Sequence, residues 1–154
     1  MLVKEVMVKR IYTVNSKDGF RKVLRVLIKN KISGVPVVNS KKRLVGVISE
    51  KDLLIHLFPS IKEFYRDIDY YLSLDVIETE AKKINRLSAS QLMTKKVYTV
   101  APEDHVLKAC SMLLIHNVRR LPVVGEGGKL VGIVTTNDLY RKFLQKYTEQ
   151  GLKK

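Results

Sequence analysis

The 154-residue sequence contains one cysteine, Cys110, and no tryptophan. One thiol cannot form an intramolecular disulfide, so a disulfide-stapled fold is excluded and Cys110 is expected to be a buried structural thiol. No apolar run approaches the ~18–20 residues that a membrane-spanning helix needs. Residues 1–10 mix charged with apolar side chains, unlike the apolar segment of a signal peptide. We therefore expect a globular, cytoplasmic protein without a membrane partner.

The residue groupings of common catalytic and metal sites are also missing. The three histidines, His56, His105 and His116, are widely separated, so they do not predict a metal cluster. The sequence shows no Cys/His pair with a third orienting group, and it has no glycine-rich phosphate-binding loop. These absences indicate a protein that is not an enzyme, has no catalytic residues and requires no metal or cofactor.

Acidic residues are scarce, with 15 against 29 Lys and Arg, which gives a formal net charge of +14. A basic protein attracts nucleic acid or phosphate-bearing ligands. The alternative is a lysine-rich surface that is only solvated. The basic residues are scattered along the chain, and no aromatic residues alternate with them as in RNA-binding motifs. Both interpretations stay open, and nucleic acid remains an alternative partner.

The sequence contains an internal repeat with an offset of 86 residues. Residues 7–14 match 93–100, residues 35–38 match 121–124, and residues 44–53 match 130–139. No gap is needed between residues 3 and 54, which chance does not produce. The chain is therefore two copies of one structural unit.

Each copy shows the same order of predicted elements. A short β-rich run, residues 9–14 in the first copy, precedes Asp18 or Asp104, which is placed to cap a helix N-terminus. Apolar residues at helical spacing follow: Phe20, Val23, Leu24, Leu27 and Ile28 in one copy and Val106, Leu107, Cys110, Leu113 and Leu114 in the other. A hairpin and a closing helix complete a β-α-β-β-α unit. We predict an α/β (α+β) fold with two such units packed about a pseudo-two-fold axis.

The repeat divides the chain into four segments: a first repeat (1–56), a helical linker (57–88), a second repeat (89–146) and a basic C-terminal tail (147–154). The linker has no glycine and contains many aromatic and charged residues, which indicates helical turns rather than a flexible chain. Two roles stay open for it: a spacer packed on the repeats, or a surface for dimerisation or partner binding.

The most informative positions are a hydroxyl and a carboxylate three residues apart, Ser49 with Asp52 and Thr135 with Asp138. Each hydroxyl ends a predicted strand, and each carboxylate lies in the first turn of the next helix. The free N–H groups at that helix end favour an anion or ribose oxygens, and the carboxylate can accept ribose hydroxyls. A capping box explains the same pattern without any ligand.

These blocks together resemble the CBS domain, named for cystathionine β-synthase. The shared pattern is Met with Tyr-Thr-Val, then apolar-Pro-Val-Val, then Leu-Val-Gly-apolar-apolar-Ser/Thr-x-x-Asp-Leu, and it covers residues 3–54 and 89–140. A stand-alone tandem pair of this kind is a regulatory unit called a Bateman module. The resemblance implies a sensor that binds AMP, ADP, ATP or S-adenosylmethionine in clefts between the repeats, with Ser49, Asp52, Thr135 and Asp138 on the ribose.

The resemblance also implies contacts for adenine and phosphate: Ile32, Ser33, Gly34, Val47, Val118, Arg119, Arg120 and Ile133. Each implied cleft combines the copies, with Asp138 beside Ile32 and Asp52 beside Val118. Arg119 and Arg120 can hold a phosphate, or they form a solvated basic pair. The first copy has Ser33-Gly34 at the corresponding positions, so we expect the two clefts to differ in affinity.

Weaker candidates come from the first strand and the helix start of each copy. Tyr12, Thr13, Tyr98 and Thr99 either contact the base or pack as edge-strand residues, and Asp18 and Asp104 would repel a phosphate. The expected partners are an adenosyl small molecule, a second copy in a homodimer and an unidentified regulated protein. Two other functions stay open, a nucleic-acid-binding basic protein and a ligand-free interaction or dimerisation module.

Overall fold

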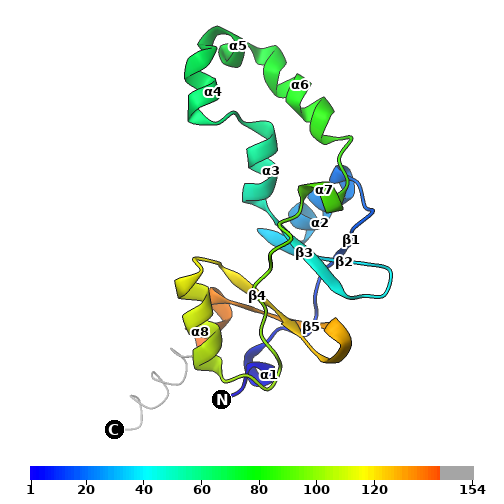
Figure 1. Ribbon diagram of the computed structural model, residues 1–154, viewed down its shortest axis with the longest axis vertical. Coiled ribbons are helices and arrows are strands. Elements are labelled where there is room, and N and C mark those ends of the chain that lie inside the picture. Colours follow the sequence, from blue (N-terminus) through cyan, green and yellow to red (C-terminus); the bar gives the residue numbers. More distant parts are fainter. Residues whose placement is uncertain (143–154) are drawn as a thin grey trace. The chain divides into compact units, whose positions relative to one another are not determined.

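The computed structural model describes residues 1–142, so the last part of the second repeat and the predicted tail 147–154 lie outside the described residues. The chain has the predicted α/β fold and forms two compact units. Of the described residues, the β1–β3 unit contains 12–41 and 45–96, and the β4–β5 unit contains 1–11, 42–44 and 97–142. Figure 1 shows the elements of both units.

The β1–β3 unit is built around a three-stranded sheet. Its strands are β1 (Val14–Asn15), β2 (Gly34–Val38) and β3 (Leu44–Ser49), in that order, and β1 runs parallel to β2. Its helices are α2 (Phe20–Asn30), α3 (Glu50–Leu57), α4 (Ile61–Arg66), α5 (Ile68–Leu72), α6 (Leu74–Ile84) and α7 (Ala89–Leu92). Val14, Val23, Val35, Val37, Ile48 and Ile84 form the fully buried centre of its core.

The β4–β5 unit repeats this arrangement, but its sheet has two strands instead of three. Strand β4 (Arg120–Val124) is antiparallel to β5 (Leu130–Thr135), and a 3-10 turn, η1 (Glu126–Gly128), joins them. Helix α1 (Val3–Val6), helix α8 (Val106–Ile115) and the helical residues 136–142 cover the strands. A parallel bridge joins Val100 to Val123, at the positions equivalent to the β1–β2 pair Val14 and Val37.

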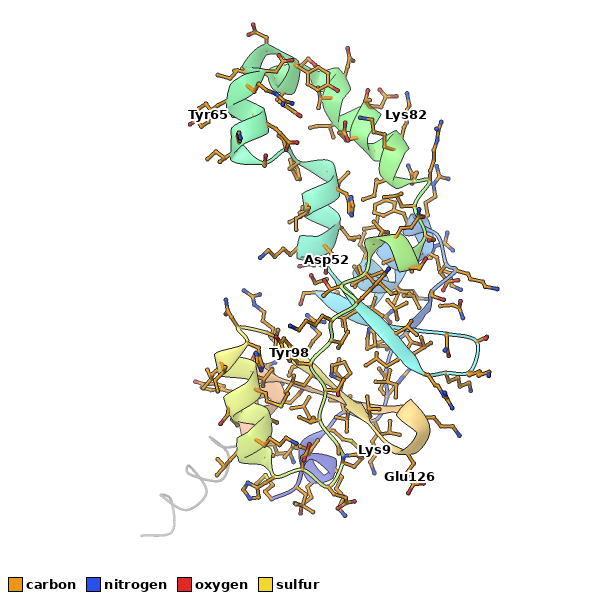
Figure 2. The ribbon with its side chains drawn as sticks, in the orientation of Figure 1. Lys9, Asp52, Tyr65, Lys82, Tyr98 and Glu126 are labelled. Carbon is orange, nitrogen blue, oxygen red and sulfur yellow. The ribbon has the colours of Figure 1, made fainter. Side chains whose placement is uncertain are left out.

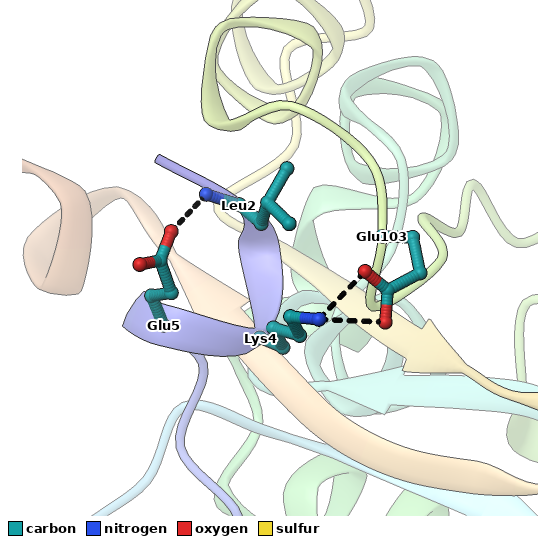
Figure 3. Close-up of polar contacts among 4 residues, drawn as sticks. All are labelled: Leu2, Lys4, Glu5 and Glu103. Atoms are coloured by element: carbon teal, nitrogen blue, oxygen red, sulfur yellow. Dashed lines mark hydrogen bonds and ion pairs between the residues drawn. The ribbon is translucent and has the colours of Figure 1, made fainter.

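Each unit takes its N-terminal segment from the other repeat. Val8 pairs with Ile133 of β5, and Thr94 pairs in the same way with Val47 of β3. Helix α1 therefore belongs to the β4–β5 unit, where the Lys4 ammonium lies 2.8 Å from the Glu103 carboxylate (Figure 3). The repeats are consecutive in sequence, but the compact units exchange their first segments.

Two local predictions are wrong. The β-rich run 9–14 forms a strand only at Val14–Asn15. Asp18 and Asp104 do not occupy the N-cap positions, which belong to Gly19 and His105. Each carboxylate instead accepts a backbone N–H three residues earlier, that of Asn15 or Ala101, and so closes the turn before the helix.

Both predicted helices are confirmed, but their buried faces are narrower than predicted, and α8 also exposes apolar side chains on its outward face. The residues that α2 and α8 bury are Phe20, Val23 and Leu27 in one helix and Val106, Ala109 and Leu113 in the other. Ile28, Leu107 and Leu114 were expected on these faces and are 67%, 59% and 79% exposed. Leu24 and Val26 of α2 and Cys110 and Met112 of α8 are partly buried against the two cores. Cys110 is half-buried rather than buried, and that burial raises the pKa of its thiol.

Residues 61–84, within the segment predicted to be a helical linker, form α4, α5 and α6. Within the β1–β3 unit these helices form an arm that extends away from the strands, and α6 returns along α3 (Figure 1). Phe64, Tyr70 and Tyr71 make ring–ring contacts inside the arm. Ile61 and Tyr65 are 75% and 68% exposed, so the arm presents an apolar surface.

The first prediction concerns Gly46, because Met93 of the exchanged N-terminal segment of the second repeat lies directly on it. A Cβ at Gly46 would lie 2.7 Å from Met93 Cγ, and Met7 covers Gly132 in the same way. Gly46→Val is expected to lower the free energy of unfolding by about 1–3 kcal/mol, as overpacking does. Urea denaturation measures the loss.

The matched test is the same substitution in a Met93→Ala background, which removes Met93 Cγ and the sulfur but keeps Cβ. The loss caused by Gly46→Val should shrink in that background, since contacting residues are not additive. An equal loss in both backgrounds would contradict the packing of Met93 on Gly46.

Candidate ligand-binding site

Ser49 and Asp52 form a closed hydrogen-bonded pair where β3 ends and α3 begins. The backbone N–H of Ser49 donates to Asp52 Oδ2 at 2.7 Å, and the hydroxyl of Ser49 donates to the same oxygen at 2.5 Å. The Asp52 N–H points back to the Ser49 hydroxyl at 3.4 Å. Figure 2 shows Asp52 in the first turn of α3. Both side chains are half-buried, so they retain an exposed edge.

Thr135 and Asp138 repeat this geometry at the end of β5. The backbone N–H and the hydroxyl of Thr135 donate to Asp138 Oδ2 at 3.0 and 2.6 Å. The Asp138 N–H points to the Thr135 hydroxyl at 3.2 Å. The structure therefore brings each predicted hydroxyl and carboxylate within hydrogen-bond distance.

A third pair shows that this geometry stabilises a helix even without a neighbouring sheet. Ser60 and Glu63 at the start of α4 form the same reciprocal box, with the Ser60 hydroxyl 2.6 Å from Glu63 Oε2. Hydrogen bonds from Ser60 also lower the pKa of Glu63. The capping interpretation thus holds for both repeats, and a ligand would use a carboxylate that the cap has already oriented.

The two pairs differ in one neighbour. The hydroxyl of Thr94 donates to Asp52 Oδ1 at 2.9 Å, so both oxygens of Asp52 are engaged within the protein. Val8 holds the equivalent place beside Asp138, because its backbone pairs with Ile133 as Thr94 pairs with Val47. Valine has no hydroxyl, so Val8 cannot make the side-chain hydrogen bond to Asp138 that Thr94 makes to Asp52.

Sequence reasoning missed Thr94, although a signal for it exists. The repeat aligns Thr94 with Val8, and that difference lies next to a matched methionine. What the sequence did not show is that this residue crosses to the strand of the other repeat. Its proximity to Asp52 follows from that exchange.

The residues before each proline lie beside the hydroxyl–carboxylate pair of their own repeat. The carbonyl of Ser33 accepts the N–H of Glu50, and the carbonyl of Arg119 accepts the N–H of Thr136. Each bond joins the pre-proline segment to the first helical residue after the motif. The combination of the two repeats in one cleft stays a prediction.

The residues predicted to contact adenine and phosphate differ in their exposure to solvent. Ile32, Val47, Val118 and Ile133 are half-buried apolar side chains, Gly34 is buried, Arg119 is exposed, and Ser33 and Arg120 are half-buried. Half-buried aliphatic side chains offer flat apolar contact to a purine. An exposed guanidinium offers paired donors to a phosphate. The first repeat has no guanidinium at these positions.

The weaker candidates differ between the repeats. Tyr98 stacks on His116, with ring centroids 3.6 Å apart and planes 9° from parallel, whereas Tyr12 is 38% exposed. The position equivalent to His116 is Asn30, which has no ring. Tyr98 therefore packs on its own unit, and Thr13 is exposed while Thr99 is half-buried.

The charges of Asp18 and Asp104 are each compensated one helical turn later. Lys22 and Lys108 donate to these carboxylates at 2.8 Å. Burial by itself raises the pKa of Asp18, but hydrogen bonds from Lys22 and Asn15 outweigh it and lower the pKa. Hydrogen bonds from Lys108 and the Ala101 N–H lower the pKa of Asp104. These ion pairs reduce the repulsion that a phosphate would meet.

Two further features limit the chemistry of the described region. Within residues 1–142, no group of three or more His, Cys, Asp or Glu side chains is placed to hold a metal ion. In the same residues no helix combines the length and the apolar character needed to cross a membrane.

Comparison with known proteins agrees with the repeat geometry. The profile of the CBS domain matches residues 3–58 and 89–145. Uncharacterized protein MJ1426 of Methanocaldococcus jannaschii is 34% identical over 154 residues, which cover 90% of this chain and 89% of that protein.

Solved structures of other CBS-pair proteins are also similar to this chain. CBSX2 of Arabidopsis thaliana in complex with AMP has a TM-score of 0.73 at 28% identity, covering 95% of this chain and 98% of that one. The CBS domain pair of protein MJ0100, in complex with 5′-methylthioadenosine and S-adenosyl-L-methionine, has a TM-score of 0.70 at 25% identity, with the same coverage. The chain belongs to the CBS domain family.

Proposed function

We propose that this chain is a regulatory module that binds an adenosyl ligand, AMP, ADP, ATP or S-adenosylmethionine, through its Ser/Thr–Asp pairs. The supporting observation is that both pairs hold a half-buried carboxylate in the first turn of a helix. The two similar structures described above contain AMP in one case and methylthioadenosine with S-adenosyl-L-methionine in the other. These ligands share an adenosine group, and the proposal concerns that group.

The pair geometry suits the hydroxyls of a ribose. A carboxylate accepts hydrogen bonds and donates none, so it selects a ligand that presents hydroxyl donors. Two adjacent ribose hydroxyls can both donate to one carboxylate, as in dinucleotide-binding folds. The adenine ring would contact the half-buried aliphatic residues, and Arg119 would hold a phosphate.

We expect Asp138 to be the stronger ribose acceptor. Thr94 already donates to Asp52 Oδ1, and a ribose there would have to displace it. Val8 imposes no such competition at Asp138. The two sites therefore differ in ribose affinity, whereas Arg119-Arg120, which the resemblance places beside Asp52, would favour a phosphate at the first pair.

The proposed role is regulation of another protein rather than catalysis. A ligand shifts the equilibrium between two conformations only by its different affinity for them. A module without a reaction of its own therefore acts by presenting a different surface to a regulated partner when the ligand is bound. The exposed linker arm is the candidate for that surface.

Nucleic-acid binding is a second candidate, and helix α2 favours it. The exposed residues of α2 include Arg21, Lys22, Arg25 and Lys29, and the helix has no acidic residue. Such a face attracts phosphate backbones. A steep loss of affinity with rising salt distinguishes this binding from recognition of one nucleotide.

The first binding prediction concerns the carboxylates. Asp138→Asn should weaken AMP binding about 10- to 100-fold, because hydrogen bonds to a charged acceptor are lost. Isothermal titration calorimetry measures the affinity. Ser60→Ala is the matched control, since it removes the same kind of cap, at a cost of about 1 kcal/mol in stability, from a helix outside the proposed site. Unchanged affinity in an Asp52→Asn, Asp138→Asn double variant would contradict the ribose assignment.

The second binding prediction concerns the residue beside each carboxylate, Thr94 at Asp52 and Val8 at Asp138. Thr94→Val frees Asp52 Oδ1 and should strengthen binding at the first pair, so that calorimetry shows a second equivalent of AMP. Val8→Thr should weaken binding at Asp138, because its new hydroxyl competes with the ribose. If neither substitution changes affinity or stoichiometry, Thr94 and Val8 do not set the difference between the sites.

A further inference from the structure

The arm of α4, α5 and α6 carries negative charge on a strongly basic chain. Residues 67–81 contain five acidic residues and no Lys, Arg or His, whereas the whole chain has a net charge of +14. Asp67, Asp69 and Asp75 form no ion pair within the part of the chain that the structure describes. The other two carboxylates, farther along α6, pair with lysines at 2.8 and 2.6 Å. The uncompensated charge therefore lies on α5 and close to its two ends.

Large apolar side chains are exposed on the same part of the arm. Ile61 and Tyr65 lie at i and i+4, on one face of α4, and Ile68 and Leu72 have the same spacing on α5. Their exposed fractions are 75%, 68%, 41% and 68%. The arm thus offers aliphatic and aromatic contact area together with negative charge.

We infer that the arm binds a basic amphipathic helix of another protein. Charge complementarity selects a basic partner, because Asp67, Asp69 and Asp75 repel nucleic acid, anionic lipid and acidic proteins. Residues 61–84 contain helices and no strand, so a partner finds no strand edge there and must satisfy its main-chain hydrogen bonds internally. A helix does this, and it can place apolar residues on the arm and Lys or Arg opposite the carboxylates.

Helix α2 of a second copy of this chain does not have these properties. Its outward face is basic, with Arg21, Arg25 and Lys29 exposed, but its apolar face is buried in its own core. Ile28 is the one large apolar residue that α2 exposes. One isoleucine cannot cover the four exposed side chains of the arm, so we assign the surface to a different protein.

Helix α3 connects the arm to the proposed ligand site. Asp52 lies in the first turn of α3, the other end of α3 leads into α4, and α6 packs along it. A ligand that shifts α3 therefore shifts the base of the arm. That the bound helix belongs to the regulated protein rests on the proposed function, whereas docking on the arm does not.

The first test titrates the full chain, without nucleotide, with an amphipathic Leu/Lys peptide of about 18 residues, or five helical turns. Calorimetry measures the affinity. Asp69→Lys should weaken binding about 10-fold, because the new charge repels the peptide. Glu126→Lys, which reverses an exposed carboxylate of the β4–β5 unit, is the matched control and should leave the affinity unchanged. Equal effects of the two substitutions, or equal affinity for a peptide with Glu in place of Lys, would overturn the inference.

The second test concerns the apolar contact. Tyr65→Ser should weaken binding of the same peptide about 10-fold, as loss of an aromatic anchor does. Ile28→Ser, at an equally exposed residue of the same unit, should not change it. Thermal melting confirms that the variants fold. If sedimentation velocity shows instead that Asp69→Lys or Tyr65→Ser breaks up an assembly of copies, the arm contacts a second copy and the inference is wrong.

The third test adds AMP. Saturating AMP should change the affinity for the peptide, and saturating peptide should change the affinity for AMP by the same factor. Titration with each ligand alone separates the two claims. Absence of peptide binding overturns docking on the arm even where AMP binds, whereas peptide binding without AMP binding supports docking and contradicts the proposed function. Peptide binding that bound AMP leaves unchanged would overturn the connection through α3.

Discussion

The N-terminal segment of each repeat pairs through its main chain with the last strand of the other repeat. This pairing determines how the strand is packed and which residue lies beside its capping carboxylate. The hydrogen bonds of Val8 with Ile133 and of Thr94 with Val47 extend each sheet with a segment from the other repeat. They place Met7 and Met93 on glycines that have no room for a side chain. They also decide which residue stands beside each capping carboxylate. One exchange therefore positions both the packing of the strands and the surroundings of the candidate sites.

Most of the elements and the candidate site pairs could be predicted from the sequence, because the internal repeat shows each of them twice. The offset located the strands, the amphipathic helices and the Ser/Thr–Asp pairs, and each pair closes as expected, with the hydroxyl at the end of a strand. The exchange itself was not predictable, since local patterns do not say which repeat a segment pairs with. For the same reason Thr94 was missed. The outward positions of Leu107 and Leu114 were predicted wrongly, because helical spacing identifies an apolar stretch without showing which of its residues face the strands.

The two repeats have kept one scaffold and changed its surfaces. Buried positions such as Val23 and Ala109, or Ile48 and Val134, stay apolar in both. The differences lie beside the carboxylates, at Thr94 and Val8, and on the outward helix faces, at Arg25 and Ser111. This distribution is expected when the core sets the fold and the surface sets binding. We propose that it gives one chain two ligand sites of unequal affinity.

The ribose assignment is the central claim, and a comparison of AMP with 2′,3′-dideoxy-AMP tests it most directly. The two molecules differ only in the hydroxyls that a carboxylate would accept. At about 100 times its dissociation constant, AMP should stabilise the protein by about 2.7 kcal/mol and raise the melting midpoint by about 5–10 °C. The dideoxy analogue at the same concentration should give little or no rise. Equal rises with both nucleotides, or none with either, would contradict the account.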